Sequence, residues 1–248
     1  MKWTFAAGMV ALAIGVAGAD AAELKLLISN GMKEAVHVLA PQFERATGHT
    51  LSIRYGTAAF LQRDMEAGES FDVTIVPAPS TDAVAKAGKL DISTRSDIAH
   101  SRIGVAARKG APKPDISTVA AFKRTMLDAK AIAYATVGTS GVHFIAVCER
   151  LGIANEVKAK GKTLPGGVLA DFVVKGEAEL AIQQISELLP VEGVELVGPF
   201  PPELQLVTTY VAATSAMSRE GAAGKAFIQF LKTPAGGAIL KAKGLDPG

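Results

Sequence analysis

The clearest structural pattern in the chain is Leu24-Lys25-Leu26-Leu27-Ile28-Ser29-Asn30-Gly31-Met32-Lys33-Glu34-Ala35. Its apolar start, residues 24–28, predicts a short buried strand that stops at the polar turn Ser29-Asn30-Gly31. From Met32 to Phe43 the apolar residues recur three or four positions apart, which predicts a helix with one buried face. The turn therefore joins a strand to a helix N-terminus, where free backbone N–H groups favour an anion. The alternative interpretation is that Ser29 or Asn30 only caps the helix.

The composition indicates a globular protein without a nucleic-acid partner. The chain has 248 residues, enough for one large domain or two small ones, and 49% of them are hydrophobic. Charged residues make up 20% and the net charge is only +2, so there is no strongly basic surface for a phosphate backbone. The aromatic fraction of 6% also argues against a platform on which bases stack.

The first 21 residues have the pattern of a secretory signal peptide. Lys2 supplies a positive start, residues 5–19 are apolar, and Ala19-Asp20-Ala21 fits a cleavage site that leaves Ala22 as the first mature residue. A membrane anchor is the alternative, but the apolar run is shorter than the roughly 20 residues that a spanning helix needs. We therefore expect a soluble, periplasmic protein.

The plan of strand, small polar turn and helix recurs along the first part of the chain. Residues 51–55 and 71–76 are predicted strands, and helices are predicted at 60–67 and 81–87. This alternation favours a parallel, doubly wound sheet, which binds ligands beyond the carboxyl ends of its strands. We therefore expect three turns at one edge of the sheet: Ser29-Asn30-Gly31, Thr57-Ala58 and Pro77-Ala78.

The rest of the chain predicts a second lobe and a return to the first. A strand at 101–109 leads into the second lobe, in which Gly138-Thr139-Ser140-Gly141 opens another helix, and an apolar stretch at 205–215 leads back. We expect an α/β protein of two lobes, each a doubly wound, mainly parallel sheet flanked by helices. Two crossover strands would form a hinge beside a cleft. The predicted boundaries are residues 22–101 with 206–248 for lobe 1, and 102–205 for lobe 2.

The sequence contains no pattern for a metal or a cofactor. The four histidines, His37, His49, His100 and His143, are scattered without paired spacing, so neither a metal site nor a cofactor is expected. A phosphate-binding loop and a dinucleotide glycine pattern are also absent. The single cysteine, Cys148, is predicted to be a buried thiol on the apolar face of a helix.

Catalytic patterns are equally weak, and no enzyme activity is expected. Val137-Gly138-Thr139-Ser140-Gly141 resembles a nucleophile turn, but its second glycine comes one position early. Ser140 and His143 could approach each other at a helix start, which leaves a hydrolase as an alternative. No acid that would orient the histidine is apparent.

The order of elements resembles the periplasmic solute-binding proteins of ABC importers, and most of all the molybdate-binding proteins (type II). The resemblance spans nearly the whole mature chain. Its most specific part is a segment that ends Glu66-Ala67-Gly68 and is followed by Asp72. The motifs that carry it are Ala40-Pro41-Gln42-Phe43-Glu44, Leu61-Gln62-Arg63-Asp64-Met65-Glu66-Ala67-Gly68 with Phe71-Asp72-Val73, Leu151-Gly152-Ile153 and Phe230-Leu231-Lys232-Thr233-Pro234.

The resemblance implies a site in which hydroxyls and backbone N–H groups bind an oxyanion without cations. Two serines and a tyrosine of that family align with Gly31, Ala58 and Gln184, so the side-chain ligands are replaced. The backbone donors would lie near Ser140 and Gly166. A lost donor leaves a buried acceptor unpaired at about 1–3 kcal/mol. The predicted ligand-binding residues are Ser29, Asn30, Gly31, Thr57, Ala58, Ser140, Gly166 and Gln184.

The resemblance implies a receptor that captures a small anionic solute between its lobes and delivers it to an ABC permease at the membrane. The ligand would be a molybdate-like oxyanion, bound as the anion, or a small carboxylate, since Gln184 and Asn30 can donate as well as accept. A monomer is expected. The alternatives are a sensory receptor without transport and the Ser140/His143 hydrolase.

Overall fold

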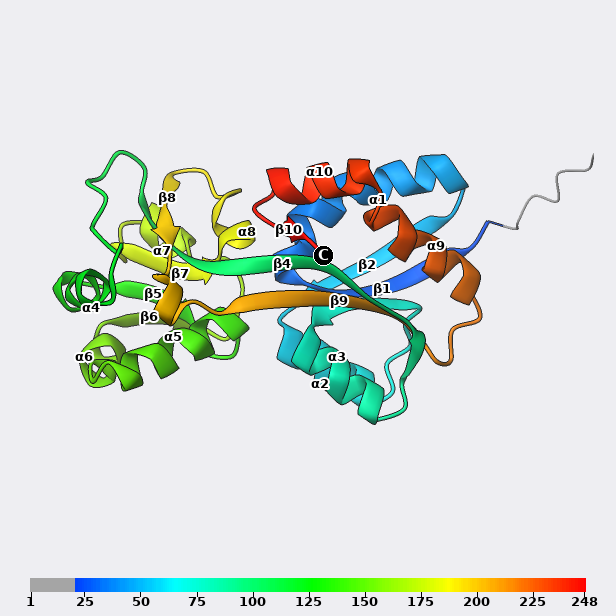
Figure 1. Ribbon diagram of the computed structural model, residues 1–248, viewed down its shortest axis with the longest axis horizontal. Helices are drawn as coiled ribbons and strands as arrows, with labels where there is room; N and C mark the ends of the chain where they lie inside the picture. The colour runs from blue at the N-terminus through cyan, green and yellow to red at the C-terminus, as the bar shows by residue number, and fades with distance from the viewer. Residues whose placement is uncertain (1–20) are drawn as a thin grey trace, which may run out of the picture.

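The computed structural model describes residues 21–248, which form two lobes side by side (Figure 1). Two long strands run between the lobes, β4 (Leu90–Arg108) and β9 (Val207–Ser215). They pair with each other antiparallel from Leu90 to Arg102 of β4, and the last residues of β4 continue into the sheet of the second lobe. The predicted two-lobed α/β fold with two crossover strands is therefore confirmed.

Lobe 1 is built on three parallel strands, β1 (Glu23–Ser29), β2 (Thr50–Gly56) and β3 (Val73–Pro77), in the order β2-β1-β3. Strand β9 adds antiparallel to β3, and β4 follows it. Strand β10 (Asp246–Pro247) pairs antiparallel with β4. The helical segments of this lobe are η1 (Asn30–Met32), α1 (Lys33–Thr47), α2 (Ala58–Glu66), α3 (Ala78–Lys86), α9 (Gly221–Leu231) and α10 (Pro234–Ala242).

Lobe 2 repeats the plan with β5 (Ile132–Ala135), β6 (Gly161–Leu164) and β7 (Leu180–Gln184), parallel in the order β7-β5-β6. Strand β4 joins β7 antiparallel, and β8 (Val194–Pro199) pairs with β4. The helical segments here are α4 (Val119–Asp128), α5 (Thr139–Arg150), α6 (Ala154–Ala159), α7 (Asp171–Val174), α8 (Ile185–Leu188) and η2 (Pro202–Leu204). The predicted lobe boundaries stay a prediction.

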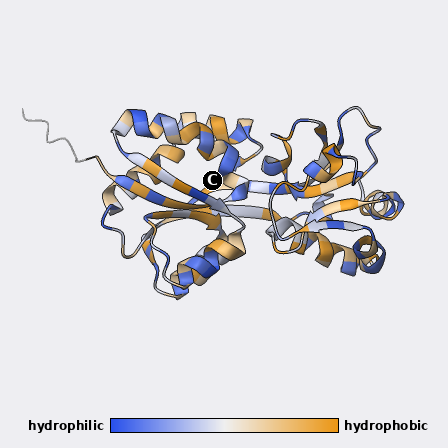
Figure 2. Ribbon diagram, turned by 180° about the vertical axis from the view of Figure 1, so that it is seen from behind, coloured by the Kyte–Doolittle hydropathy of each residue, from blue (hydrophilic) through white to orange (hydrophobic). Residues whose placement is uncertain are grey.

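Each lobe buries its own apolar core between sheet and helices. In lobe 1, Phe43 of α1 packs edge-on against Phe227 of α9, with ring centroids 5.2 Å apart. In lobe 2, Phe122 of α4 packs against Phe200 at 4.7 Å. In Figure 2 the strands of both lobes carry hydrophobic positions interspersed with hydrophilic ones, and the helices also alternate between hydrophobic and hydrophilic positions. Cys148 is buried in the second core, as predicted, and burial raises the pKa of its thiol to about 12.

The Gln205 side chain holds β4 at the point where this strand passes from one lobe to the other. The Gln205 side chain accepts from the backbone N–H of Ile103 at 2.9 Å and donates to its carbonyl at 2.9 Å. This side-chain amide therefore makes the two hydrogen bonds that a neighbouring strand would make with Ile103, at the point where β4 leaves β9 and joins the second sheet. The motion of a hinge would be absorbed on either side of this contact.

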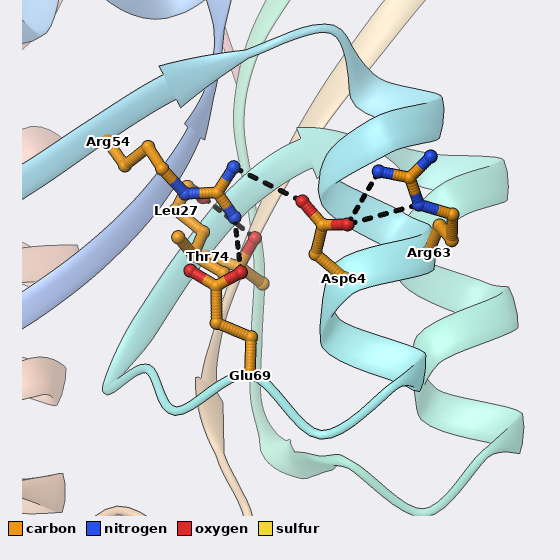
Figure 3. A network of polar contacts seen from close by, with 6 residues as sticks. All are labelled: Leu27, Arg54, Arg63, Asp64, Glu69 and Thr74. Carbon is orange, nitrogen blue, oxygen red and sulfur yellow. Dashed lines mark hydrogen bonds and ion pairs between the residues drawn. The ribbon is translucent and has the colours of Figure 1, made fainter.

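A polar network on the surface of lobe 1 fixes helix α2, which carries one of the predicted binding turns (Figure 3). Arg54 of β2 reaches Asp64 of α2 at 3.3 Å and Glu69 at 2.7 Å. Beneath it the Thr74 hydroxyl donates to the Leu27 carbonyl at 2.9 Å and links β3 to β1. Because the ion pairs are partly exposed, each contributes about 0–1 kcal/mol, so the network orients α2 more than it stabilises the fold.

Several predicted element boundaries were wrong, for identifiable reasons. Strand β4 begins at Leu90 and not at the expected residue 101. The prediction missed its first half because that half is largely polar and partly exposed. Helix α3 begins at Ala78, with Pro79 in its first turn, where a missing N–H costs no hydrogen bond. A helix was expected at residues 168–174, but helix α7 spans only Asp171–Val174, because residues 165–168 form an irregular loop.

The predicted signal peptide, except for its last residue, lies outside the described residues. Within residues 21–248, no helix combines the length and the apolar character required to cross a membrane.

Candidate functional site

A small cavity of about 40 Å³ lies between the two lobes and is lined by residues of both. All eight predicted ligand-binding residues line it. Pro77 and Ala78, expected at the same edge of the sheet, are not among its lining residues. The full lining is Ser29, Asn30, Gly31, Thr57, Ala58, Ala135, Gly138, Thr139, Ser140, Gly166, Gly167, Gln183, Gln184, Glu187 and Tyr210.

Three strand-to-helix turns bring helix N-termini to this cavity: Ser29 before η1 and α1, Thr57 before α2, and Gly138 before α5. Each of these residues has extended backbone angles, and none makes a side-chain cap on its own helix. The capping interpretation of Ser29 is therefore not what the structure shows. Free N–H groups and helix dipoles converge from both lobes, which favours a bound anion.

Tyr210 of β9 supplies a tyrosine hydroxyl that the sequence analysis missed. A side chain at position 31 would collide with this hydroxyl, so Gly31 is required where the resembled family has a serine. Tyr210 is 2% exposed, and its hydroxyl is hydrogen-bonded to Ser29. Burial, together with the nearby charge of Glu187, raises the pKa of Tyr210. The phenol therefore stays neutral and can donate a hydrogen bond into the site.

The two lobes touch at Thr57 and Gly166. A side chain at Gly166 would run into the Thr57 hydroxyl of the opposite lobe, so only glycine allows this approach. Gln183 holds the Gly166 loop in place, since its amide accepts from Leu169 N–H at 2.8 Å and donates to the Gly167 carbonyl at 2.9 Å. Gly167 adopts a φ of 106°, which other residues rarely adopt. The two lobes are therefore closed on each other at this point.

Gln184, which aligns with the family's tyrosine, lies at the end of β7 and is 3% exposed. Its Nε2 donates to the Thr208 hydroxyl at 2.8 Å, and its Oε1 has no hydrogen-bond partner among the described residues. The Thr208 hydroxyl can donate as well as accept, so the Gln184 amide can turn over and present N–H groups to an anion. A buried amide with one free end indicates a place for a polar ligand group.

Glu187 is the most consequential residue that the sequence analysis missed, because it is a carboxyl that lines the inner cavity. Burial raises its pKa to about 7, while a hydrogen bond from the Gln184 backbone N–H works in the opposite direction. This bond is half of a capping box, since Gln184 is the N-cap of α8 and Glu187 lies three residues later. In the sequence, the spacing Gln184-x-x-Glu187 at the end of a buried strand was the pattern that could have identified Glu187 as part of the site.

The raised pKa predicts a pH-dependent stability. Between the ordinary value of 4.5 and about 7, the folded protein holds a proton on Glu187 that the unfolded chain has released. The free energy of unfolding should therefore fall as the pH rises across this window, by at most about 3 kcal/mol for this group. The charged and titratable groups around it are Tyr210, Lys33 and Glu34. Urea unfolding of wild type and Glu187→Gln at pH 5 and pH 8 measures the effect. If the free energies of unfolding of the two proteins differ by the same amount at pH 5 and at pH 8, the prediction is contradicted.

A second cavity of about 320 Å³ adjoins the first and shares Asn30, Gly167, Gln183 and Glu187 with it. Lys33 and Glu34 of α1 lie on its wall. A ligand that is too large for the inner cavity can therefore place one anionic group among the helix N-termini and extend past Glu187 toward Lys33.

His143 does not join the site. Its Nε2 donates to the carbonyl of Leu204 at 2.8 Å, and it is not among the cavity-lining residues. No hydrogen bond links it to Ser140 in the described part of the chain. Within residues 21–248, no three His, Cys, Asp or Glu side chains are grouped in a way that could hold a metal ion.

The fold and this cavity define a two-lobed protein that encloses a small polar solute. The chain belongs to the family of bacterial extracellular solute-binding proteins, which matches residues 24–246. Together with the molybdate-binding relatives described next, this match confirms the predicted resemblance to solute-binding proteins of the molybdate-binding type.

Known relatives differ in what they bind or do. An aconitate isomerase from Pseudomonas sp. is 32% identical over 90% of this chain and 87% of that protein. The molybdate-binding protein ModA of Escherichia coli (strain K12) is 25% identical over 98% of this chain and 97% of that protein. The structure of the Azotobacter vinelandii periplasmic molybdate-binding protein superposes with a TM-score of 0.75 at 20% identity, covering 90% of this chain and 98% of that one, which shows the fold alone.

Proposed function

We propose that this protein is a periplasmic receptor that closes on a small carboxylate-bearing anion and delivers it to an ABC permease. The observation that carries the proposal is the Glu187 carboxyl in the wall of an otherwise neutral anion site. A carboxyl with a pKa of about 7 can share its proton with a ligand carboxylate near neutral pH.

Two further features support a carboxylate over a tetrahedral oxyanion. Gly31 and Ala58 offer no hydroxyl, and Tyr210 fills the space in front of Gly31. The adjoining cavity provides room for a longer molecule, with Lys33 available for a second carboxylate. The family and the predicted signal peptide support the periplasmic location, and the family's partners support delivery to a permease.

Thermal melts with a panel of solutes test the proposal. The panel contains citrate, cis- and trans-aconitate, succinate, sulfate, molybdate and tungstate. A ligand present at 100 times its dissociation constant stabilises the folded protein by about 2.7 kcal/mol. We expect the melting temperature to rise with a di- or tricarboxylate and to stay unchanged with molybdate and tungstate. A rise with molybdate and tungstate alone would overturn the choice of ligand.

A second candidate function is isomerisation of an unsaturated polycarboxylate. It is favoured by the 32% identity to an aconitate isomerase and by the presence of an acid–base group in the cavity. A receptor needs only to bind its solute, whereas an isomerase needs a group that gains and loses a proton near neutral pH. Among the described residues that line the inner cavity, Glu187 is the group with these properties.

A further inference from the structure

Two titratable side chains lie together in the inner cavity, Glu187 of α8 and Tyr210 of β9. They are close enough for the charge of Glu187 to contribute to the raised pKa of Tyr210. The remaining inner-cavity residues of the described chain offer hydroxyls, amides and backbone groups, none of which exchanges a proton near neutral pH. The inner cavity therefore combines one proton acceptor with several fixed hydrogen-bond donors.

This combination suits chemistry at a carbon next to a carboxylate. Removing a proton from such a carbon builds negative charge on the carboxylate oxygens. Preorganised donors at helix N-termini stabilise developing charge of this kind. The base works best when its pKa lies near the operating pH, and burial gives Glu187 such a value.

We propose that Glu187 is the catalytic base and acid of a 1,3-proton shift in an unsaturated polycarboxylate held between the lobes. The inference rests on the second candidate function. The Glu187 carboxylate takes a proton from the methylene carbon beside the double bond. The C–H electron pair forms a new double bond to the central carbon. The former double-bond pair then takes the proton back from the Glu187 carboxyl at the far carbon. No oxidant or reductant is needed.

Tyr210 and Ser29 have a positioning role in this scheme. The neutral Tyr210 phenol is hydrogen-bonded to Ser29 and is held in front of Gly31. Its hydroxyl can donate to the carboxylate on which charge accumulates, while the three helix N-termini bind the remaining oxygens. Tyr210→Phe should therefore lower kcat more than it changes the affinity for the ligand.

Proton NMR of cis- and trans-aconitate in D₂O tests the role of Glu187. We expect the wild-type protein to interconvert the isomers and to introduce deuterium at the allylic carbons. Glu187→Gln keeps the size and the capping acceptor of Glu187 but cannot take a proton, so its rate should fall by about 10²–10⁴-fold. The aconitate-induced rise in melting temperature should persist in this variant. Glu192→Gln changes an exposed carboxyl outside the site and should retain the wild-type rate.

The pH profile adds a readout that a structural role would not change. The base must be ionised, so the wild-type kcat/KM should rise with pH through about 7, the pKa of Glu187. A Glu187→Gln rate within a few-fold of wild type would overturn the assignment. Binding of aconitate by the wild type without any exchange would also overturn it and leave the receptor function standing. Failure of every polycarboxylate to bind would overturn both.

Discussion

Gly166→Ala is expected to weaken ligand binding by about 5- to 150-fold without lowering the melting temperature of the ligand-free protein in its open state. The added methyl group would collide with the Thr57 hydroxyl of the opposite lobe. Overpacking of this kind costs about 1–3 kcal/mol, and here the cost falls on the closed state alone. Since only the closed state encloses the ligand, the full cost appears as lost affinity.

A double-mutant cycle shows whether this contact is the cause. Thr57→Ala removes the obstructing hydroxyl, so Gly166→Ala should cost much less affinity in a Thr57→Ala background than in the wild type. Calorimetric titration of the four proteins with the same carboxylate measures the coupling. Equal losses in both backgrounds would show that Gly166 does not meet Thr57 when the lobes close. Gly221→Ala, at a glycine with open space around its Cα, serves as the control and should leave affinity unchanged.

Gly141→Ala is expected to destabilise the fold by about 3 kcal/mol. Its methyl group would be directed into the backbone carbonyl of Ala135, at the end of β5, and a backbone group cannot rotate away. The clash would push the start of α5 off the sheet and displace Ser140 from the cavity. Both stability and ligand affinity should therefore fall.

The loss of stability can be measured by urea unfolding and by the melting temperature. A change of 1 kcal/mol shifts the melting temperature by about 2–4 °C in a protein of 150–250 residues, so a decrease of about 6–12 °C is expected. Gly221→Ala again provides the matched control, because the same substitution there meets no atom. A Gly141→Ala protein with wild-type stability would contradict the tight packing of α5 on β5.

Much of the fold could be predicted from the sequence, because its alternation of apolar runs and small polar turns follows directly from how strands and helices bury their faces. The opening stretch at residues 24–35 forms the predicted strand, turn and helix, and Gly48 ends α1 with a φ of 77°, as a C-cap glycine should. The first half of β4 was missed because its polar residues, which lie partly in solvent, do not give the pattern of a buried strand.

The candidate site was only partly predictable, for a different reason. The turns at Ser29, Thr57 and Ser140 could be found because each follows a strand and begins a helix. Tyr210 lies within a long apolar strand, where a tyrosine is ordinarily a core residue. Glu187 lies on a helix of only four residues, too short to show a periodic pattern. Which of these side chains faces the cavity depends on how the two lobes close, and no local pattern in the sequence records that.

The most direct test of the central claim, that the interlobe cavity is a carboxylate site, is calorimetric titration of the protein at pH 7 with aconitate, citrate and molybdate in parallel. We predict saturable one-to-one binding of a polycarboxylate and no heat from molybdate. Tight binding of molybdate, with no heat from any carboxylate, would contradict the claim.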